Sequence, residues 1–234
     1  MDYQNTAVRA RSQELVNGFV RSVYNWMAGG LAITGLVAFY TANSPTMVNA
    51  IVGTPMLFFG LIIAELVMVF TLSARIYKMQ AQTATALFIG YAVLNGLTLS
   101  VIFLAYTSAS ITSTFFICAA TFAACSVYGY STKRDLTSMG GFMFMGLIGI
   151  IIASLVNIFL KSPALYWTIS YIGVVVFVGL TAYDTQKIKN MARTMPADVG
   201  AGAARKGAIM GALALYLDFI NLFLMLLRIF GDRR

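Results

Sequence analysis

Seven apolar runs, each about 20 residues long, follow one another along this chain of 234 residues. About 20 residues of α-helix span the hydrocarbon core of a bilayer, which is about 30 Å thick. Short polar breaks, such as Asn43-Ser44-Pro45 and Ser162-Pro163, separate the runs. The sequence therefore predicts an all-α polytopic membrane protein with seven transmembrane helices, near residues 24–42, 51–72, 84–106, 111–130, 141–160, 164–184 and 208–230.

The composition indicates a membrane protein. Hydrophobic residues make up 59% of the chain and charged residues 10%, whereas soluble domains contain about 25% charged residues. We expect one membrane domain, residues 24–234, after a polar cytoplasmic segment, residues 1–23, that shows no cleavable signal peptide. The net charge of +8 would suggest nucleic acid in a soluble protein. Here the basic residues lie between apolar runs, so the expected surroundings are the lipid bilayer, with no nucleic-acid partner.

The basic residues also predict the orientation. Twelve of the 16 lysines and arginines lie in the segments that share a side with the N-terminus. The other four are Lys161, Arg228, Arg233 and Arg234. The excess predicts a cytoplasmic N-terminus. Three of the four minority charges are in the C-terminal tail, and a last helix that re-enters the membrane would return that tail to the cytoplasm. We favour seven full spans and leave the side of the tail open.

The last run, Ala208–Phe230, carries one aspartate, Asp218, at its middle. An ionisable group at the centre of a membrane helix costs several kcal/mol and almost always faces a bundle interior or a water-filled path. Asn221 follows at a spacing that places it on the same helix face. We therefore expect this helix to be surrounded by the others.

Three more charged residues that could carry chemistry lie within or at the edge of the apolar runs. Glu65 lies in the second run, Arg75 ends it, and Asp184 ends the sixth. Arg75 and Asp184 reach the same predicted side at similar depth, so an ion pair between them is geometrically reasonable. Two carboxylates close together in a low-dielectric site share a proton, and such a pair could respond to pH in a chain without histidine. It could also bind Ca²⁺ through its oxygens.

A direct pair of Asp184 and Asp218 meets an obstacle of depth. Asp218 lies ten residues, about 15 Å, into its helix, whereas Asp184 lies near the predicted cytoplasmic surface. Contact would need a tilted helix, a kink or an aqueous vestibule. Simpler roles also remain open: Asp184 as an interfacial charge beside Lys187, Arg75 as a topology marker, and Asp218 as a structural residue.

Two long stretches resemble the signature stretches of the Bax inhibitor-1 (transmembrane Bax inhibitor motif) family: GLTAYDTQKIKNM at residues 179–191 and ALYLDFINLFLMLLRIFG at residues 214–231. The string STKRDL, which begins at Ser131, resembles the bacterial branch of that family. The resemblance implies a seven-helix fold in which the C-terminal helix is central and wrapped by the other six. It also implies a pH-sensitive calcium leak, gated by an aspartate dyad and an arginine that latches one of the aspartates.

Matched to this chain, the resemblance implies that Asp184 and Asp218 form the proton-sensing, gating dyad and the possible Ca²⁺ ligands. Arg75 would be the latch, Glu65 an acidic residue of the ion pathway, and Asn221 a further candidate for that pathway. No cofactor is expected, with Ca²⁺ as the transported ion and a bacterial inner membrane as the location. The resemblance implies an alternative function, in which the chain binds and modulates a membrane-anchored AAA protease. The polar N-terminal segment, residues 1–23, would then be the contact.

An enzymatic function is not expected. Two aspartates on neighbouring runs superficially resemble an intramembrane aspartyl protease, but that family needs Gly-x-Gly-Asp, and this chain has Leu215-Tyr216-Leu217-Asp218. Its Pro-Ala-Leu motif follows the catalytic helices, whereas Pro163-Ala164-Leu165 precedes the sixth run. The sequence contains no zinc-ligand motif, serine-nucleophile motif or phosphate loop.

Overall fold

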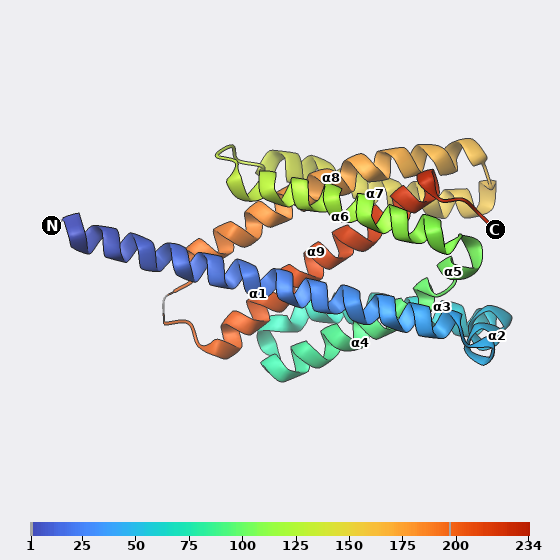
Figure 1. The fold of residues 1–234 in the computed structure, drawn as a ribbon, viewed down its shortest axis with the longest axis horizontal. Coiled ribbons are helices and arrows are strands. Elements are labelled where there is room, and N and C mark those ends of the chain that lie inside the picture. The colour runs from blue at the N-terminus through green and yellow to red at the C-terminus, as the bar shows by residue number, and fades with distance from the viewer. Residues whose placement is uncertain (1, 197) are drawn as a thin grey trace. The chain divides into compact units, whose positions relative to one another are not determined.

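The computed structural model describes residues 2–196 and 198–234, and within the first helix it describes side chains from Gln13 onward. These residues form α-helices joined by short connections, and they contain no β-strand (Figure 1). The elements are α1 (Asp2–Ala42), α2 (Pro45–Gly53), α3 (Pro55–Arg75), the 3-10 helix η1 (Ile76–Lys78), α4 (Ala81–Leu99), α5 (Ile102–Ala105), α6 (Ser108–Ser131), α7 (Thr137–Leu160), α8 (Pro163–Thr194) and α9 (Ala201–Phe230).

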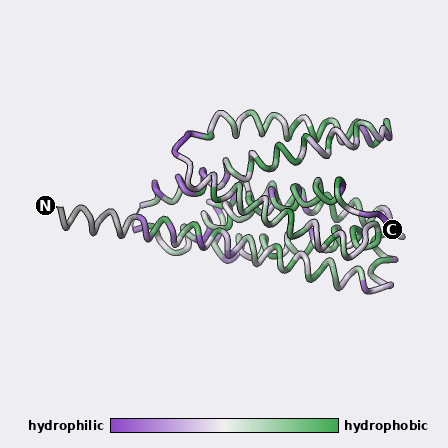
Figure 2. Tube along the Cα trace, turned by 45° about the horizontal axis from the view of Figure 1, so that its top comes forward, coloured by the Kyte–Doolittle hydropathy of each residue, from purple (hydrophilic) through white to green (hydrophobic). Residues whose placement is uncertain are grey.

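Seven segments within the described residues are long and apolar enough to cross a membrane. Figure 2 shows hydrophobic colouring along most of these helices and hydrophilic stretches near helix ends. The prediction of an all-α protein with seven membrane-spanning helices is therefore confirmed. The segments are Gln13–Ala42, Pro55–Lys78, Ala81–Ala105, Ser108–Ser131, Thr137–Leu160, Pro163–Thr194 and Ala201–Phe230.

The second span begins at Pro55, later than the predicted start at residue 51. Pro55 occupies the first turn of α3, where its missing N–H costs nothing, and Thr54 before it has the non-helical angles φ −122° and ψ 88°. Residues 45–53 form the separate helix α2. The apolar run at residues 51–72 thus contains a helix boundary that hydropathy alone does not mark.

Helices α8 and α9 both extend beyond the predicted apolar runs. Helix α8 continues ten residues past Asp184 to Thr194, and α9 begins at Ala201, seven residues before the predicted start. Gln186 explains part of the continuation, because its side chain accepts a hydrogen bond from Leu136 N at 2.8 Å and donates one to Arg134 O at 2.8 Å. The polar residues after Asp184 therefore belong to a packed helix.

The chain divides into two compact units. The first comprises residues up to 105 together with residues 189–216, and the second comprises residues 106–188 and 217–234. Helix α9 begins in the first unit and ends in the second. In the most apolar 18-residue stretch of this helix 72% of the residues are buried, the highest share among the seven candidate spans. A single membrane domain and a central C-terminal helix wrapped by six others stay predictions.

Two glycines allow close helix contacts in the second unit. A Cβ at Gly129 of α6 would overlap the carbonyl oxygen of Ala182 on α8, and a Cβ at Gly140 of α7 would overlap the ring of Tyr183. Small residues at such positions let helix backbones approach each other within a bilayer. Both contacts lie directly before Asp184, so α6 and α7 fix the part of α8 that carries this carboxyl group.

We predict that Gly129→Ala lowers the stability of the purified protein by about 1–3 kcal/mol, because the added methyl group forces α6 away from the α8 backbone. The matched control is Gly149→Ala on α7, where an added Cβ meets nothing within 4 Å. This control should leave stability unchanged or raise it by up to about 1 kcal/mol. Thermal unfolding in detergent measures both variants, and equal effects would contradict the predicted close contact.

Candidate functional site

Asp218 is a deeply buried carboxyl group of the second unit. It lies on α9 with 4% of its surface exposed, next to the buried residues Phe219 and Leu222. Its Oδ2 atom has no hydrogen-bond partner among the described residues. A buried polar atom without a partner is costly, and native proteins retain few of them. Asp218 is therefore the strongest single indication of function in the described part of the chain.

Asp184 lies on α8, half-buried, and within electrostatic range of Asp218. The positive charge of Lys187, one turn along the same helix, acts on Asp184, and its Nζ atom lies 5.9 Å from the centre of the Tyr183 ring. The charges of the two predicted members of the dyad thus act on each other, and their role as a dyad stays a prediction. Helix α8 continues past Asp184, so this carboxyl group lies within the helix and not at its end.

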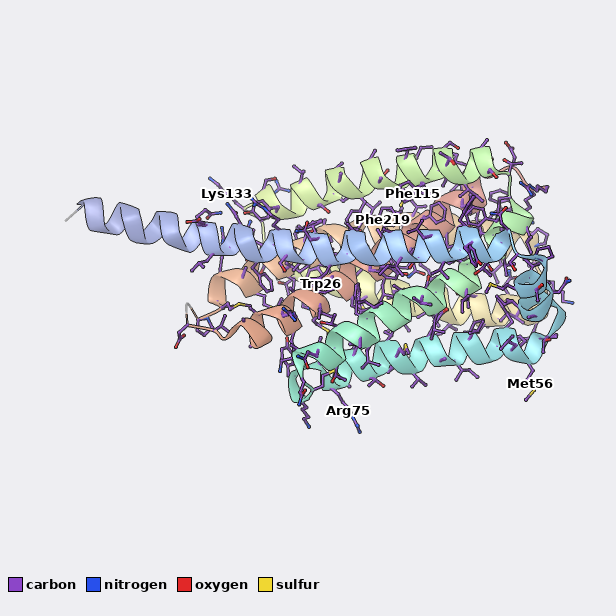
Figure 3. All side chains as sticks on the ribbon, turned by 60° about the horizontal axis from the view of Figure 1, so that its bottom comes forward. Trp26, Met56, Arg75, Phe115, Lys133 and Phe219 are labelled. Atoms are coloured by element: carbon purple, nitrogen blue, oxygen red, sulfur yellow. The ribbon has the colours of Figure 1, made fainter. Side chains whose placement is uncertain are left out.

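Helix α6 supplies the packing beside Asp218. The rings of Phe115 and Phe122 lie 5.6 Å and 5.4 Å from that of Phe219, and Figure 3 labels Phe115 and Phe219 in this part of the chain. The Cys118 thiol donates to the carbonyl oxygen of Phe219 at 3.6 Å. These contacts fix the turn of α9 that carries Asp218, and α6 offers the carboxyl group no charged partner.

Glu65 belongs to a polar network of the first unit. Its Oε1 atom accepts a hydrogen bond from Thr98 Oγ1 at 2.7 Å, and its Oε2 atom lies 3.5 Å from the donor Asn95 Nδ2. Asn95 Nδ2 also lies 3.3 Å from the Tyr91 hydroxyl oxygen. Helix α4 therefore supplies the donors that hold this half-buried carboxylate of α3.

The network continues beside the first half of α9. The Tyr91 and Tyr216 rings meet edge to face with centroids 5.6 Å apart. Thr34 donates its hydroxyl hydrogen to Ala92 O at 2.8 Å, so the 2.6 Å contact between Thr34 Oγ1 and the Tyr216 hydroxyl is donated by the tyrosine. Sequence analysis missed these residues; Asn95, an amide inside an apolar run, was the one available signal.

The structure does not test the predicted Arg75 latch. Arg75 ends α3 with an exposed side chain that points away from the ribbon in Figure 3. It belongs to the first unit, whereas Asp184 and Asp218 belong to the second. The role of Arg75 stays a prediction.

Asn221 is half-buried and donates its side-chain amide to Leu217 O at 2.8 Å. It lines a cavity of about 280 Å³ with apolar residues of α7. The described residues contain no cluster of three or more histidine, cysteine, aspartate or glutamate side chains.

We predict that Thr34→Val lowers the free energy of unfolding by about 1 kcal/mol, because it leaves the Tyr216 hydroxyl without its acceptor inside the membrane. The matched control is Thr121→Val on α6, where the exposed hydroxyl bonds only to its own helix at Ile117 O. That control should change stability by less than about 0.5 kcal/mol. Unfolding in mixed micelles measures both, and a neutral Thr34→Val would show that the contact contributes little.

Comparison with known proteins shows the family of this chain. The family model described as "Inhibitor of apoptosis-promoting Bax1" matches residues 16–234. The chain is 56% identical over 216 residues to the inner membrane protein YbhL of Escherichia coli, covering 92% of each chain. It is 46% identical over 218 residues to a protein of Borreliella burgdorferi, covering 93% of each, and 38% identical over 218 residues to a membrane protein of Streptococcus pyogenes, covering 92% of this chain and 93% of that one. This multi-pass membrane protein belongs to the Bax inhibitor-1 family.

Proposed function

We propose that the protein is a pH-sensitive pathway for cations, with Ca²⁺ as the transported ion, gated by protonation of Asp184 and Asp218. The observation that carries the proposal is the burial of Asp218, whose Oδ2 atom lacks a hydrogen-bond partner while the Asp184 charge acts on it. A buried carboxyl pair of this kind is rare unless it binds protons or cations.

The surroundings of the pair support proton-dependent gating. Within the second unit, α6 and α7 carry no charged residue, α6 places the Cys118 thiol against Phe219 O, and the positive charge of Lys187 on α8 acts on Asp184. With both carboxyls ionised, their repulsion must be balanced by a cation. Protonation of one carboxyl removes the repulsion without any ion. Proton and cation occupancy are thereby coupled, as a pH-gated leak requires.

The direction of gating follows from the family resemblance. At high cytoplasmic pH the ionised pair would be held by Arg75, which closes the cytoplasmic end. Protonation weakens that latch and changes the fraction of open molecules. Glu65, held by donors from α4, supplies a second negative centre for a cation on its path, and Asn221 supplies an amide at the neighbouring turn to Asp218.

The first experiment measures Ca²⁺ entry into dye-loaded proteoliposomes between about pH 6 and 8. The chain has no histidine, so a pH response in this range must come from carboxyl groups. We predict a pH-dependent flux in the parent protein that Asp218→Asn abolishes or makes independent of pH, because the amide cannot exchange a proton. Asp135→Asn is the matched control. This exposed aspartate of the α6–α7 connection accepts hydrogen bonds from Thr137 N and Thr137 Oγ1, which lower its pKa, and its variant should keep the parent profile.

Two results would contradict the proposal in different ways. A parental pH profile in both Asp184→Asn and Asp218→Asn would remove the dyad from the gate. Flux no greater than that of empty vesicles at every pH would remove the pathway itself. The alternative would then be the membrane-anchored AAA protease as partner. Its predicted contact, residues 1–23, begins with side chains that lie outside the described residues.

A further inference from the structure

A basic cavity of about 530 Å³ lies in the second unit, where α7 ends, α8 begins and α9 ends. Three of its lining residues are cations, and none is acidic. Lys161, Arg228 and Arg233 are three of the four basic residues that lie opposite the predicted cytoplasmic side. The complete lining is Asn157, Lys161, Ser162, Pro163, Tyr166, Trp167, Arg228, Ile229, Gly231 and Arg233.

The two arginines meet on one aromatic ring. The guanidinium carbons of Arg228 and Arg233 lie 5.2 Å and 5.4 Å from the centre of the Tyr166 ring. Arg233 also donates to the Tyr166 hydroxyl at 2.7 Å. The neighbouring carboxylate, Asp232, is bonded to Ser110 instead, through Asp232 N at 3.0 Å and Oδ2 at 3.4 Å. The cavity therefore gathers positive charge without a carboxylate to balance it.

Lys161 reaches this cavity from an unfavourable backbone position. Its φ of 48° lies in the left-handed region, and it is the one described residue other than glycine with a positive φ. Glycine or asparagine is the usual choice at such a helix end. The turn is held by the Asn157 side chain, whose Oδ1 atom accepts from Ser162 N at 2.9 Å. From this position Lys161 lines the cavity.

A second, apolar cavity adjoins the first at Arg228, which lines both. Its volume is about 280 Å³, and α7 supplies most of its wall through Leu147, Ile150, Ile151, Leu155 and Ile158. Free phosphate or another small anion would use only the basic cavity. A ligand that fills both needs an anionic head and a hydrocarbon chain.

We propose that the two cavities bind one anionic phospholipid. Its headgroup phosphate lies among Lys161, Arg228 and Arg233, and one acyl chain lies along α7. Guanidinium groups bind phosphate through paired hydrogen bonds, and basic pockets between membrane helices suit acidic headgroups. Trp167 lines the basic cavity and stacks on Tyr171 at 6.1 Å, as aromatic residues at a membrane interface do. With the N-terminus in the cytoplasm, this site faces the outer leaflet.

Trp167 provides the reporter for the test. The chain has two tryptophans, so Trp26→Phe leaves Trp167 as the single fluorophore in an otherwise complete protein. The protein is reconstituted in vesicles that contain either brominated phosphatidylglycerol or brominated phosphatidylcholine, each diluted in the same unbrominated mixture. We expect Trp167 to be quenched at a lower mole fraction of the brominated anionic lipid. Arg233→Gln should weaken that preference roughly fivefold, as expected for one cation near an anionic lipid.

Arg234→Gln is the matched control, because it removes the same charge from the same tail outside the cavity lining. It should keep the parental preference, and Arg228→Lys, which keeps the charge, should retain most of it. Three results would overturn the proposal. They are equal quenching by the two brominated lipids in the parent, an equal loss of preference in Arg233→Gln and Arg234→Gln, and a preference abolished by excess inorganic phosphate, which would identify the ligand as a free anion.

Discussion

A carboxyl group in hydrocarbon needs a partner inside the protein, because no water is there to solvate it. Three of the carboxyl groups in its spans, Glu65, Asp184 and Asp218, have different surroundings. Glu65 receives donors from α4, Asp184 is half-buried near Lys187, and Asp218 is enclosed with one oxygen unbonded. The least satisfied group lies on α9, the most buried candidate span. Burial of that helix makes the position of Asp218 costly.

The packing around Asp218 depends on residues that carry no charge. Gly129 and Gly140 allow α6 and α7 to contact α8 beside Asp184, while the α6 phenylalanines fix the facing turn of α9. Gln186 ties the next turn of α8 to the connection between α6 and α7. The carboxyl pair is therefore held by rigid helices and not by loops, which is the arrangement that keeps two repelling groups close.

The length of the apolar runs sufficed to predict seven spans, because crossing a bilayer requires about 20 apolar residues whatever their neighbours. Asp218 could be identified for a related reason, because a carboxyl group inside such a run costs free energy unless the protein supplies a polar or charged partner. Hydropathy could not show that α8 continues through the polar residues after Asp184, because that continuation depends on Gln186 meeting Leu136 and Arg134, 50 and 52 positions away. Thr34 and Tyr216 were missed for the same reason, since their bond joins residues 182 positions apart.

The four cations opposite the predicted cytoplasmic side present a conflict that a re-entrant last helix would have relieved. Helix α9 instead runs without a break for 30 residues, about 45 Å, which is ample for a full span. Three of the four cations converge on one cavity beside an apolar one, and the proposed lipid would account for charges that topology alone disfavours. Arg228 lies ten residues from Asp218 on the same helix, about 15 Å along its axis. A lipid bound at Arg228 would therefore contact the rigid element that also carries the proposed gate.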